Sequence, residues 1–407
     1  MQALRRTLMA VVVLAPALAS AGKPGAGGTT GPAFVTAFTT ARPKIADPVG
    51  DNALYGGGQH AMQLAGNQLV VAFPDYQDDG QSVWVARSLD GGATWLPAAR
   101  AGFGSGISST GAPLAIGPDP AGAGKYRVHV IWMARPVNTT AASIYYAYAT
   151  LDPSLGKNAL GYFSYPVNVT GGAIASSYGE LTVAADGMGG VHIAAGGWVD
   201  GAPGVMYSRS ADYGATFVET GVLVAPGAGR PALAATATGE AFLAYELSPG
   251  SYVARRAQGA AAFDAPVLVT PTGRAEISLA AADANRLYLA WVYDEAPLYS
   301  SRYHVARSTD GGQSWAIFHS ATAGLSLFGP SIAVSATGTV GVAFSDYGTD
   351  IGTYVRSTDG GVTWSGPATI APMTWGATLL FDAAGKANLA FVESANGGGA
   401  IYFAKEK

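Results

Sequence analysis

Carboxylate and aromatic side chains recur at one place in this chain, just beyond short apolar segments that end in an aromatic residue. Asp75, Asp346 and Glu393 each follow such an aromatic residue by two positions, and Tyr293 does the same. Sugars stack their apolar faces on aromatic rings and offer hydroxyl groups to carboxylates. We therefore expect carbohydrate binding, with Asp346 and Tyr293 among the binding residues. The alternative is that these residues occupy ordinary polar loops.

A tyrosine and a glutamate stand close together where another pair of apolar segments begins. Glu180 follows Tyr178 by two residues. A carboxylate beside a phenol is a candidate catalytic carboxylate or a candidate Tyr/Glu pair. The catalytic candidates are therefore Glu180, Tyr178 and Asp75.

Arginines occupy connecting segments of the same kind. Arg135, Arg230 and Arg274 all lie outside the apolar segments. Grouped around one opening, they would attract an acidic sugar, and we take them as candidates for substrate binding. The alternative is that they are solvated loop residues or form salt bridges within the fold.

Other kinds of site find little support in the sequence. The chain has no cysteine, and its five histidines form no pair four residues apart, so we expect no metal and no cofactor. His129 and His192 lie within apolar segments, where we expect them to be packed. With 23 basic and 27 acidic residues, a net charge of −4 and no basic run, the chain is not expected to bind nucleic acid or an anionic membrane.

The N-terminus has the three-part pattern of a secretory signal peptide. Arg5 and Arg6 precede an apolar stretch at 8–18, and small residues follow at 19–21. We expect a signal peptide at 1–21, a flexible linker at 22–32 and one domain at 33–407. No later segment is apolar enough for membrane insertion. The mature protein should be secreted, to a periplasm or outside the cell, as a monomer.

A short motif repeats four times. It reads RSLDGGATW, RSADYGATF, RSTDGGQSW and RSTDGGVTW, and its aspartates are 122, 98 and 49 residues apart. These separations fit a unit of roughly 50 to 60 residues in which some copies of the motif have been lost. The aspartates are Asp90, Asp212, Asp310 and Asp359.

Pairs of apolar strands repeat independently of this motif. The second strands are expected at 69–73, 128–132, 191–195, 241–245, 287–291, 340–344 and 387–391. A third strand follows each pair, and the motif would form the turn to a fourth. The sequence thus predicts an all-β propeller of four-stranded blades, with seven blades favoured and six as the alternative. The last blade would borrow its outer strand from the N-terminus, at 33–40.

The motif Ser-x-Asp-x-Gly-x-Thr-Trp resembles the Asp-box, or BNR repeat, of sialidases and their relatives. The resemblance implies a sialidase-like propeller in which the four aspartates are structural turn residues away from the active centre. Families with this motif include sialidases, other glycosidases, sorting receptors and non-catalytic assembly factors.

Sialidase activity would further imply three arginines that clamp a substrate carboxylate, a tyrosine nucleophile activated by a glutamate, and an aspartate as general acid and base. In that family the first arginine belongs to an Arg-Ile-Pro motif, whereas the matching stretch here is Gln59-His60-Ala61-Met62. Whether the protein is an enzyme is thus left open. We expect a propeller that recognises a glycan at its central face, with glycoside hydrolysis of the sialidase type as a possible activity. The alternative is a non-catalytic scaffold that binds protein partners.

Overall fold

The computed structural model divides the chain into two units, Met1–Ala33 and Phe34–Lys407. It describes residues 44–49, 61–75, 82–103, 111–134, 141–171, 173–175, 181–271, 276–295, 300–324, 327–346, 351–372, 375–395 and 398–407, all in the second unit. The expected signal peptide and linker lie outside the described residues. In the described part of the chain, no helix is long and apolar enough to span a membrane.

Seven antiparallel sheets follow one another along the chain and form the seven blades of a β-propeller. Blade 1 contains β2 (Met62–Ala65), β3 (Gln68–Asp75), β4 (Ser82–Ser88) and β5 (Ala99–Phe103), and blade 2 contains β6 (Leu114–Pro118), β7 (Tyr126–Ala134), β8 (Ser143–Leu151) and β9 (Val167–Asn168). Blade 3 contains β10 (Ile174–Ala175), β11 (Leu181–Ala185), β12 (Val191–Val199), β13 (Ala202–Ser210) and β14 (Glu219–Pro226). Its innermost position is shared by β10 and β11, which both pair with β12.

The remaining blades have the same strand order. Blade 4 contains β15 (Gly229–Ala235), β16 (Ala241–Leu247), β17 (Gly250–Arg256) and β18 (Val267–Thr270), and blade 5 contains β19 (Glu276–Ala281), β20 (Leu287–Glu295), β21 (Ser300–Ser308) and β22 (Ala316–Gly324). Blade 6 contains β23 (Leu327–Val334), β24 (Val340–Asp346), β25 (Ile351–Ser357) and β26 (Ala368–Pro372). Blade 7 contains β27 (Trp375–Phe381), β28 (Ala387–Ala395), β29 (Gly398–Lys405) and β1 (Lys44–Val49). A short 3-10 helix, η2 (Pro153–Asn158), follows β8.

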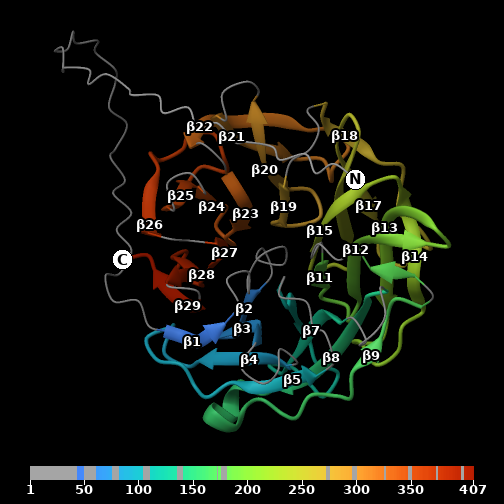
Figure 1. Cartoon of the computed structure of the whole chain (residues 1–407), viewed down its shortest axis with the longest axis vertical. Coiled ribbons are helices and arrows are strands. Elements are labelled where there is room, and N and C mark those ends of the chain that lie inside the picture. Colours follow the sequence, from blue (N-terminus) through green and yellow to red (C-terminus); the bar gives the residue numbers. More distant parts are fainter. Residues whose placement is uncertain are drawn as a thin grey trace, which may run out of the picture. The chain divides into compact units, whose positions relative to one another are not determined.

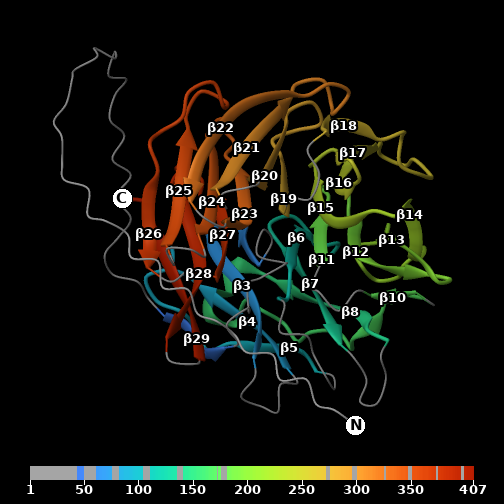
Figure 2. The ribbon, with the colours of Figure 1, turned by 45° about the horizontal axis from the view of Figure 1, so that its top comes forward.

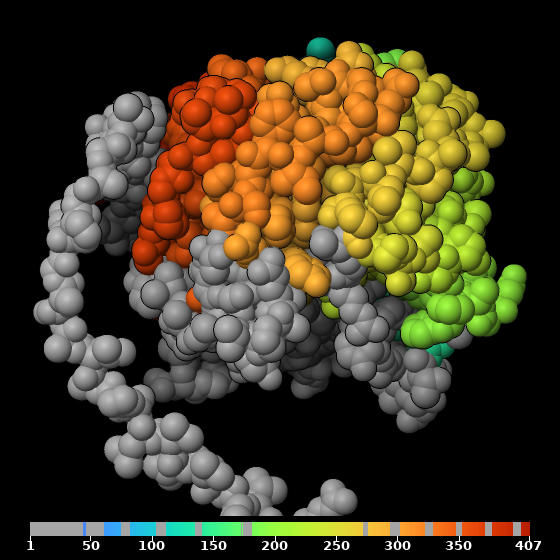
Figure 3. All heavy atoms as spheres, turned by 90° about the horizontal axis from the view of Figure 1, so that it is seen from above, coloured from blue at the N-terminus to red at the C-terminus, as the bar shows by residue number. Residues whose placement is uncertain are grey.

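The seven-bladed prediction is confirmed, and the six-bladed alternative is wrong. Figures 1 and 2 show the blades side by side around a centre to which each contributes its innermost strand. Turned by 90°, the later blades form a continuous surface that passes from yellow through orange to red (Figure 3).

The ring is closed by an N-terminal strand, as the sequence predicts, but the strand lies further along the chain. The outer strand of blade 7 is β1, which pairs with β29 through Lys44 and Tyr402. The segment at 33–40, expected in this role, lies outside the described residues. An outer strand has one unpaired edge, and the lysine, aspartate and proline of KIADPV are residues that suit such an edge.

Both faces of each blade are buried, which explains why the second strands read as almost continuous apolar runs. Seven clusters of buried side chains each join two consecutive blades around the ring. Between blades 1 and 2, Val70 and Val85 pack with Val128 and Trp132. On the other side of β7, Ile131 packs in the cluster shared with blade 3. The blades thus form a ring of sheet-on-sheet cores.

Hydrogen bonds also join neighbouring innermost strands. The hydroxyl of Thr182 accepts a bond from the backbone N–H of Leu233 at 3.2 Å, across the boundary between blades 3 and 4. Ser278 accepts in the same way from Ile332 at 3.1 Å, between blades 5 and 6. A small hydroxyl residue at this position satisfies a buried amide that the neighbouring sheet leaves unpaired.

Antiparallel order gives the propeller two different faces. The upper face is where the innermost strands begin and where second strands lead into third strands. The aspartate face, opposite, carries the turns from first to second strands and those from third to fourth strands. The four repeated motifs form the latter turns, at 88–94, 210–216, 308–314 and 357–363. We call these segments the aspartate turns.

Candidate functional site

The sequence candidates that the structure describes lie at the upper face. Arg230 stands near the start of the innermost strand β15, and Asp346 ends the second strand β24. Asp75 ends β3, although the structure does not describe its side chain, and Tyr293 lies near the end of β20. The remaining candidates, Arg135, Tyr178, Glu180 and Arg274, lie outside the described residues.

Arg230 has a backbone conformation that is unusual for its residue type. Its φ of 50° falls in the left-handed region. The pairing of β15 with β16 moves from Gly229 and Glu246 to Ala232 and Ala244, so β15 contains one extra residue at this point. This is a β-bulge, and such bulges redirect side chains at strand ends and beside functional sites.

Blade 6 has the same bulge but places a glycine in it. The pairing of β23 with β24 moves from Phe328 and Ser345 to Ser331 and Ala343, and Gly329 has a φ of 51°. Each left-handed residue precedes a proline in the sequence. Glycine adopts this conformation without a steric penalty, whereas a residue with a Cβ atom loses about 1–2 kcal/mol. Blade 4 therefore keeps an arginine where glycine would be the less strained residue.

The Arg230 side chain reaches solvent and lies beside a carboxylate. Its Nε atom is 3.9 Å from Oε2 of Glu246, and the side chain remains 43% exposed against 13% for the glutamate. A partly exposed pair at this distance contributes at most about 1 kcal/mol to stability. The contact with Glu246 is therefore a weak electrostatic one.

Aromatic residues of the two neighbouring blades lie on the same face. Trp198, near the end of β12 in blade 3, is 42% exposed. Tyr293 in blade 5 is half-buried and packs against the cluster shared with blade 4. Arg230 thus belongs to a blade that is flanked on both sides by an aromatic residue at the upper face.

The Asp346 side chain is almost fully buried, with only 4% of the residue exposed. The backbone of Asp346 in β24 lies opposite Leu327 in β23 on one side and opposite Ile351 in β25 on the other. In the adjacent bulge, the carboxylate of Glu276 in β19 accepts a hydrogen bond from the backbone N–H of Gly329. Sequence reasoning did not select Glu276, because its role depends on a bulge in the following blade.

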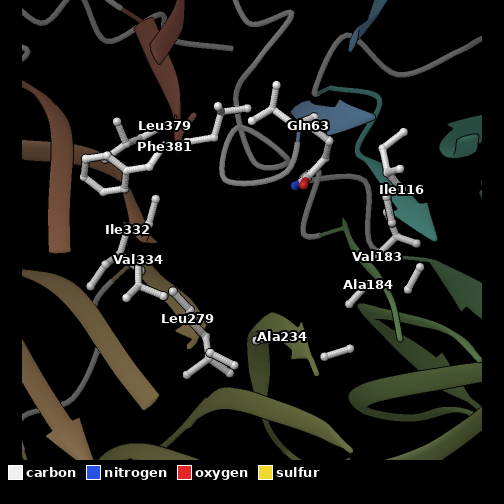
Figure 4. Close-up of a pocket in the computed structure, with 18 residues that line it drawn as sticks. Gln63, Ile116, Val183, Ala184, Ala234, Leu279, Ile332, Val334, Leu379 and Phe381 are labelled. Carbon is white, nitrogen blue, oxygen red and sulfur yellow. The ribbon is translucent and has the colours of Figure 1, made fainter. Parts of the chain in front are cut away.

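The axial channel is lined mainly by apolar side chains and lies toward the aspartate face, where the innermost strands end. A cavity of about 300 Å³ is lined by the innermost strands of all seven blades. Among the side chains labelled in Figure 4, only Gln63 carries a polar group, and its amide points into the channel. None of the residues that line the cavity is charged.

The aspartate turns use their carboxylates internally. Asp90 accepts hydrogen bonds from the backbone N–H of Thr94 at 2.8 Å, the Thr94 hydroxyl at 2.6 Å and the Ser88 hydroxyl at 2.8 Å. The bonds from Thr94, then that from Ser88, lower the pKa of Asp90 to about 2. Asp212, Asp310 and Asp359 accept the corresponding bonds in their turns.

Two histidines that the sequence places in apolar strands are indeed packed. His129 and His192 are 1% and 2% exposed, and their Nδ1 atoms pair with the hydroxyls of Tyr146 and Tyr207 at 2.8 and 2.6 Å. Burial lowers the pKa of His129 to about 3. Among the residues that the structure describes, no group of three His, Asp or Glu side chains is placed to hold a metal ion.

Comparison with known proteins confirms the fold. No protein-family model and no curated protein matches the sequence. The structure is similar to that of an ulvan lyase of polysaccharide lyase family PL25, with a TM-score of 0.59 and 12% identity over 88% of this chain and 94% of the lyase. It is also similar to a Trypanosoma rangeli sialidase, with a TM-score of 0.49 and 10% identity over 91% of this chain and 58% of the sialidase. At 12% identity, the similarity to the ulvan lyase is one of fold.

Proposed function

We propose that this protein recognises an acidic saccharide at the upper face, with Arg230 as the residue that receives a carboxylate or sulfate group. The observation that supports this most strongly is the left-handed backbone of Arg230, at a position where blade 6 has glycine. Strained residues persist where the side chain has a use that outweighs the strain.

The surroundings of Arg230 suit such a ligand. A guanidinium group presents several N–H donors in a plane that matches a carboxylate, and Glu246 lies 3.9 Å from its Nε atom. Trp198 and Tyr293 offer aromatic rings from the neighbouring blades, on which an apolar sugar face can stack. The ulvan lyase with the same fold was solved with bound -[GlcA(1-4)Rha3S]-, a saccharide that carries acidic groups.

The finer proposal is a glycoside hydrolase of the sialidase type. In that case Tyr178, Glu180 and Asp75 would supply nucleophile, base and acid, and Arg135 and Arg274 would join Arg230 at the substrate. The alternative is a non-catalytic propeller that binds protein partners. A turnover assay separates the two, because a scaffold cleaves no saccharide.

We further propose that the protein is exported and monomeric. The pattern of Arg5, Arg6 and the apolar stretch at 8–18 supports export. N-terminal sequencing of the mature protein should begin at Gly22, and light scattering should give the mass of one chain. A mature protein that retains residues 1–21 would contradict the proposed export.

The test of function is a panel of saccharides assayed for binding and cleavage with the mature protein. It includes sialosides, uronate oligosaccharides, sulfated oligosaccharides and their neutral counterparts. Cleavage is followed by released reducing ends for hydrolysis and by ultraviolet absorbance of unsaturated uronate for elimination. We expect at least one acidic saccharide to bind, and Arg230→Gly to abolish that binding while the fold is kept. If no acidic saccharide binds, or if Arg230→Gly binds as tightly as the wild type, the proposal is wrong.

A further inference from the structure

A second concave site lies on the aspartate face, between blades 2, 3 and 4. The groove has a volume of about 640 Å³, within the range of pockets that hold small ligands. Its polar and aromatic lining consists of Asp119, Lys125, Tyr126, Asp186, Tyr213 and Thr236. The roles proposed above for Arg230 and its neighbours do not involve any of these residues.

Tyr213 is the unusual residue of this groove. It has a φ of 62° and occupies the position that Gly91, Gly311 and Gly360 fill in the other aspartate turns, with φ of 69°, 72° and 72°. Three of the four turns thus use glycine for a left-handed conformation, and one uses tyrosine. The strain of a Cβ atom applies here as it does at Arg230.

The backbone bonds of Tyr213 do not need its side chain. Its N–H donates to the carbonyl of Gly189 at 2.7 Å, and its carbonyl accepts from Nη1 of Arg127 at 2.8 Å. The carbonyl of Gly360 accepts from Arg307 in the same way, also at 2.8 Å. A glycine at this position therefore supports the same hydrogen bond between blades, and that bond does not require the phenol ring.

The ring is held in place by the neighbouring turn. A Cβ atom on Gly189 would lie 2.5 Å from Cε1 of Tyr213, so the ring packs directly over this glycine. The groove thus contains a fixed aromatic ring, and Tyr126 contributes a second ring to its wall. Fixed aromatic surfaces bind flat apolar groups with little loss of side-chain entropy.

The charges around the groove argue against an acidic ligand. Arg127 pairs with Asp119 at 3.4 Å, and Lys125 pairs with Asp152 at 3.3 Å. Asp186 also lines the groove and accepts bonds from His192 and two backbone amides. The cations are thus matched by carboxylates, and Asp119 and Asp186 are each only 5% exposed and accept internal hydrogen bonds.

We propose that this groove binds a neutral saccharide, which stacks on Tyr213. The site is independent of the upper face and differs from it in ligand charge. It would hold part of a polysaccharide at a distance from the face that carries Arg230.

The experiment uses cellohexaose, xylohexaose and mannohexaose as probes, titrated by calorimetry into the full mature chain with Arg230→Gly. This background removes the group proposed for the upper face, so the two proposals can fail separately. We expect one of the hexasaccharides to bind and Tyr213→Gly to weaken that binding at least about tenfold, while the midpoint of thermal unfolding stays equal or rises. Tyr213→Asn should weaken binding to the same extent as Tyr213→Gly, because asparagine also tolerates the left-handed backbone.

Tyr162→Gly is the matched control, because that tyrosine is 102% exposed and does not line the groove. It should bind as the background does. Failure of all three probes to bind would overturn the proposal, as would equal losses from Tyr162→Gly and Tyr213→Gly. A fall of several degrees in the melting temperature of both Tyr213 variants would also overturn it, because it would show that the ring holds the fold.

Discussion

Arg230 and Gly329 occupy the same backbone position in two blades. Each is the left-handed residue of a bulge in an innermost strand, with φ of 50° and 51°, and each is followed by proline. The same backbone geometry therefore carries a long cationic side chain in blade 4 and a glycine, without a side chain, in blade 6. This comparison within one molecule separates what the fold requires from what the side chain adds.

The energetic cost of the left-handed backbone can be measured at Gly329, because a Cβ atom there would meet no close neighbour. In Gly329→Ala the new Cβ atom would meet nothing closer than Oε2 of Glu276 at 3.8 Å. We therefore expect only the cost of the left-handed backbone, a loss of about 1–2 kcal/mol in the free energy of unfolding. Urea denaturation measures it. A loss below about 0.3 kcal/mol would remove the argument from strain at Arg230.

The hydrogen bonds between innermost strands make a second prediction. Thr182→Val removes the hydroxyl that satisfies the Leu233 amide, and a buried amide without a partner costs about 1–3 kcal/mol. Thr378→Val is the matched control, because the buried Thr378 hydroxyl makes no hydrogen bond among the described residues. Denaturation should show a loss for the first variant and little change for the second. Equal losses would indicate that side-chain packing, and not the bond, is responsible.

Adjacent glycines of one aspartate turn should differ sharply in their tolerance of a side chain. A Cβ atom on Gly92 would lie 2.0 Å from the Phe403 ring of blade 7, whereas one on Gly91 would approach only Lys405 Nζ, at 3.4 Å. Gly91→Ala should cost about 1–2 kcal/mol for its φ of 69°. Gly92→Ala should cost about 1–3 kcal/mol more through overpacking. Thermal unfolding of both variants tests the order, and the reverse order would contradict the described contact between blades.

The buried histidines predict a loss of stability in weak acid. Burial, and then Arg127, holds the pKa of His129 at about 3, below its ordinary value of 6.5. The unfolded chain therefore binds the proton first, so stability is complete above about pH 6.5 and falls toward pH 3. His129→Gln should reduce the slope in this window by up to about 1.4 kcal/mol per pH unit. Urea titrations between pH 4 and 7 measure it, and an unchanged slope would contradict the neutral buried state.

The sequence was sufficient to predict the repeat, the blade order and the burial of His129. Apolar runs such as LVVAF require burial on both faces, and a ring of sheets provides it. The outer strand of blade 7 was misplaced, because the apolar segment at 33–40 looks more strand-like than the charged edge strand at 44–49.

The candidate site was only partly predictable. Arg230 was selected for its charge, but its strain depends on a bulge that no local pattern marks except the following proline. Tyr213 did carry a signal, since RSADYGATF has tyrosine where the other three motifs have glycine. The meaning of that signal became clear only when the position proved to be left-handed and to line a groove.

The most direct test of acidic saccharide recognition pairs a change in the ligand with a change in the protein. An acidic oligosaccharide that binds, and its counterpart with carboxylates reduced to alcohols, are titrated by calorimetry into the wild type and Arg230→Gly. We expect the wild type to prefer the acidic ligand by at least about tenfold and the variant to bind both equally, with a melting temperature equal to or above that of the wild type. The same preference in both proteins would contradict the role of Arg230.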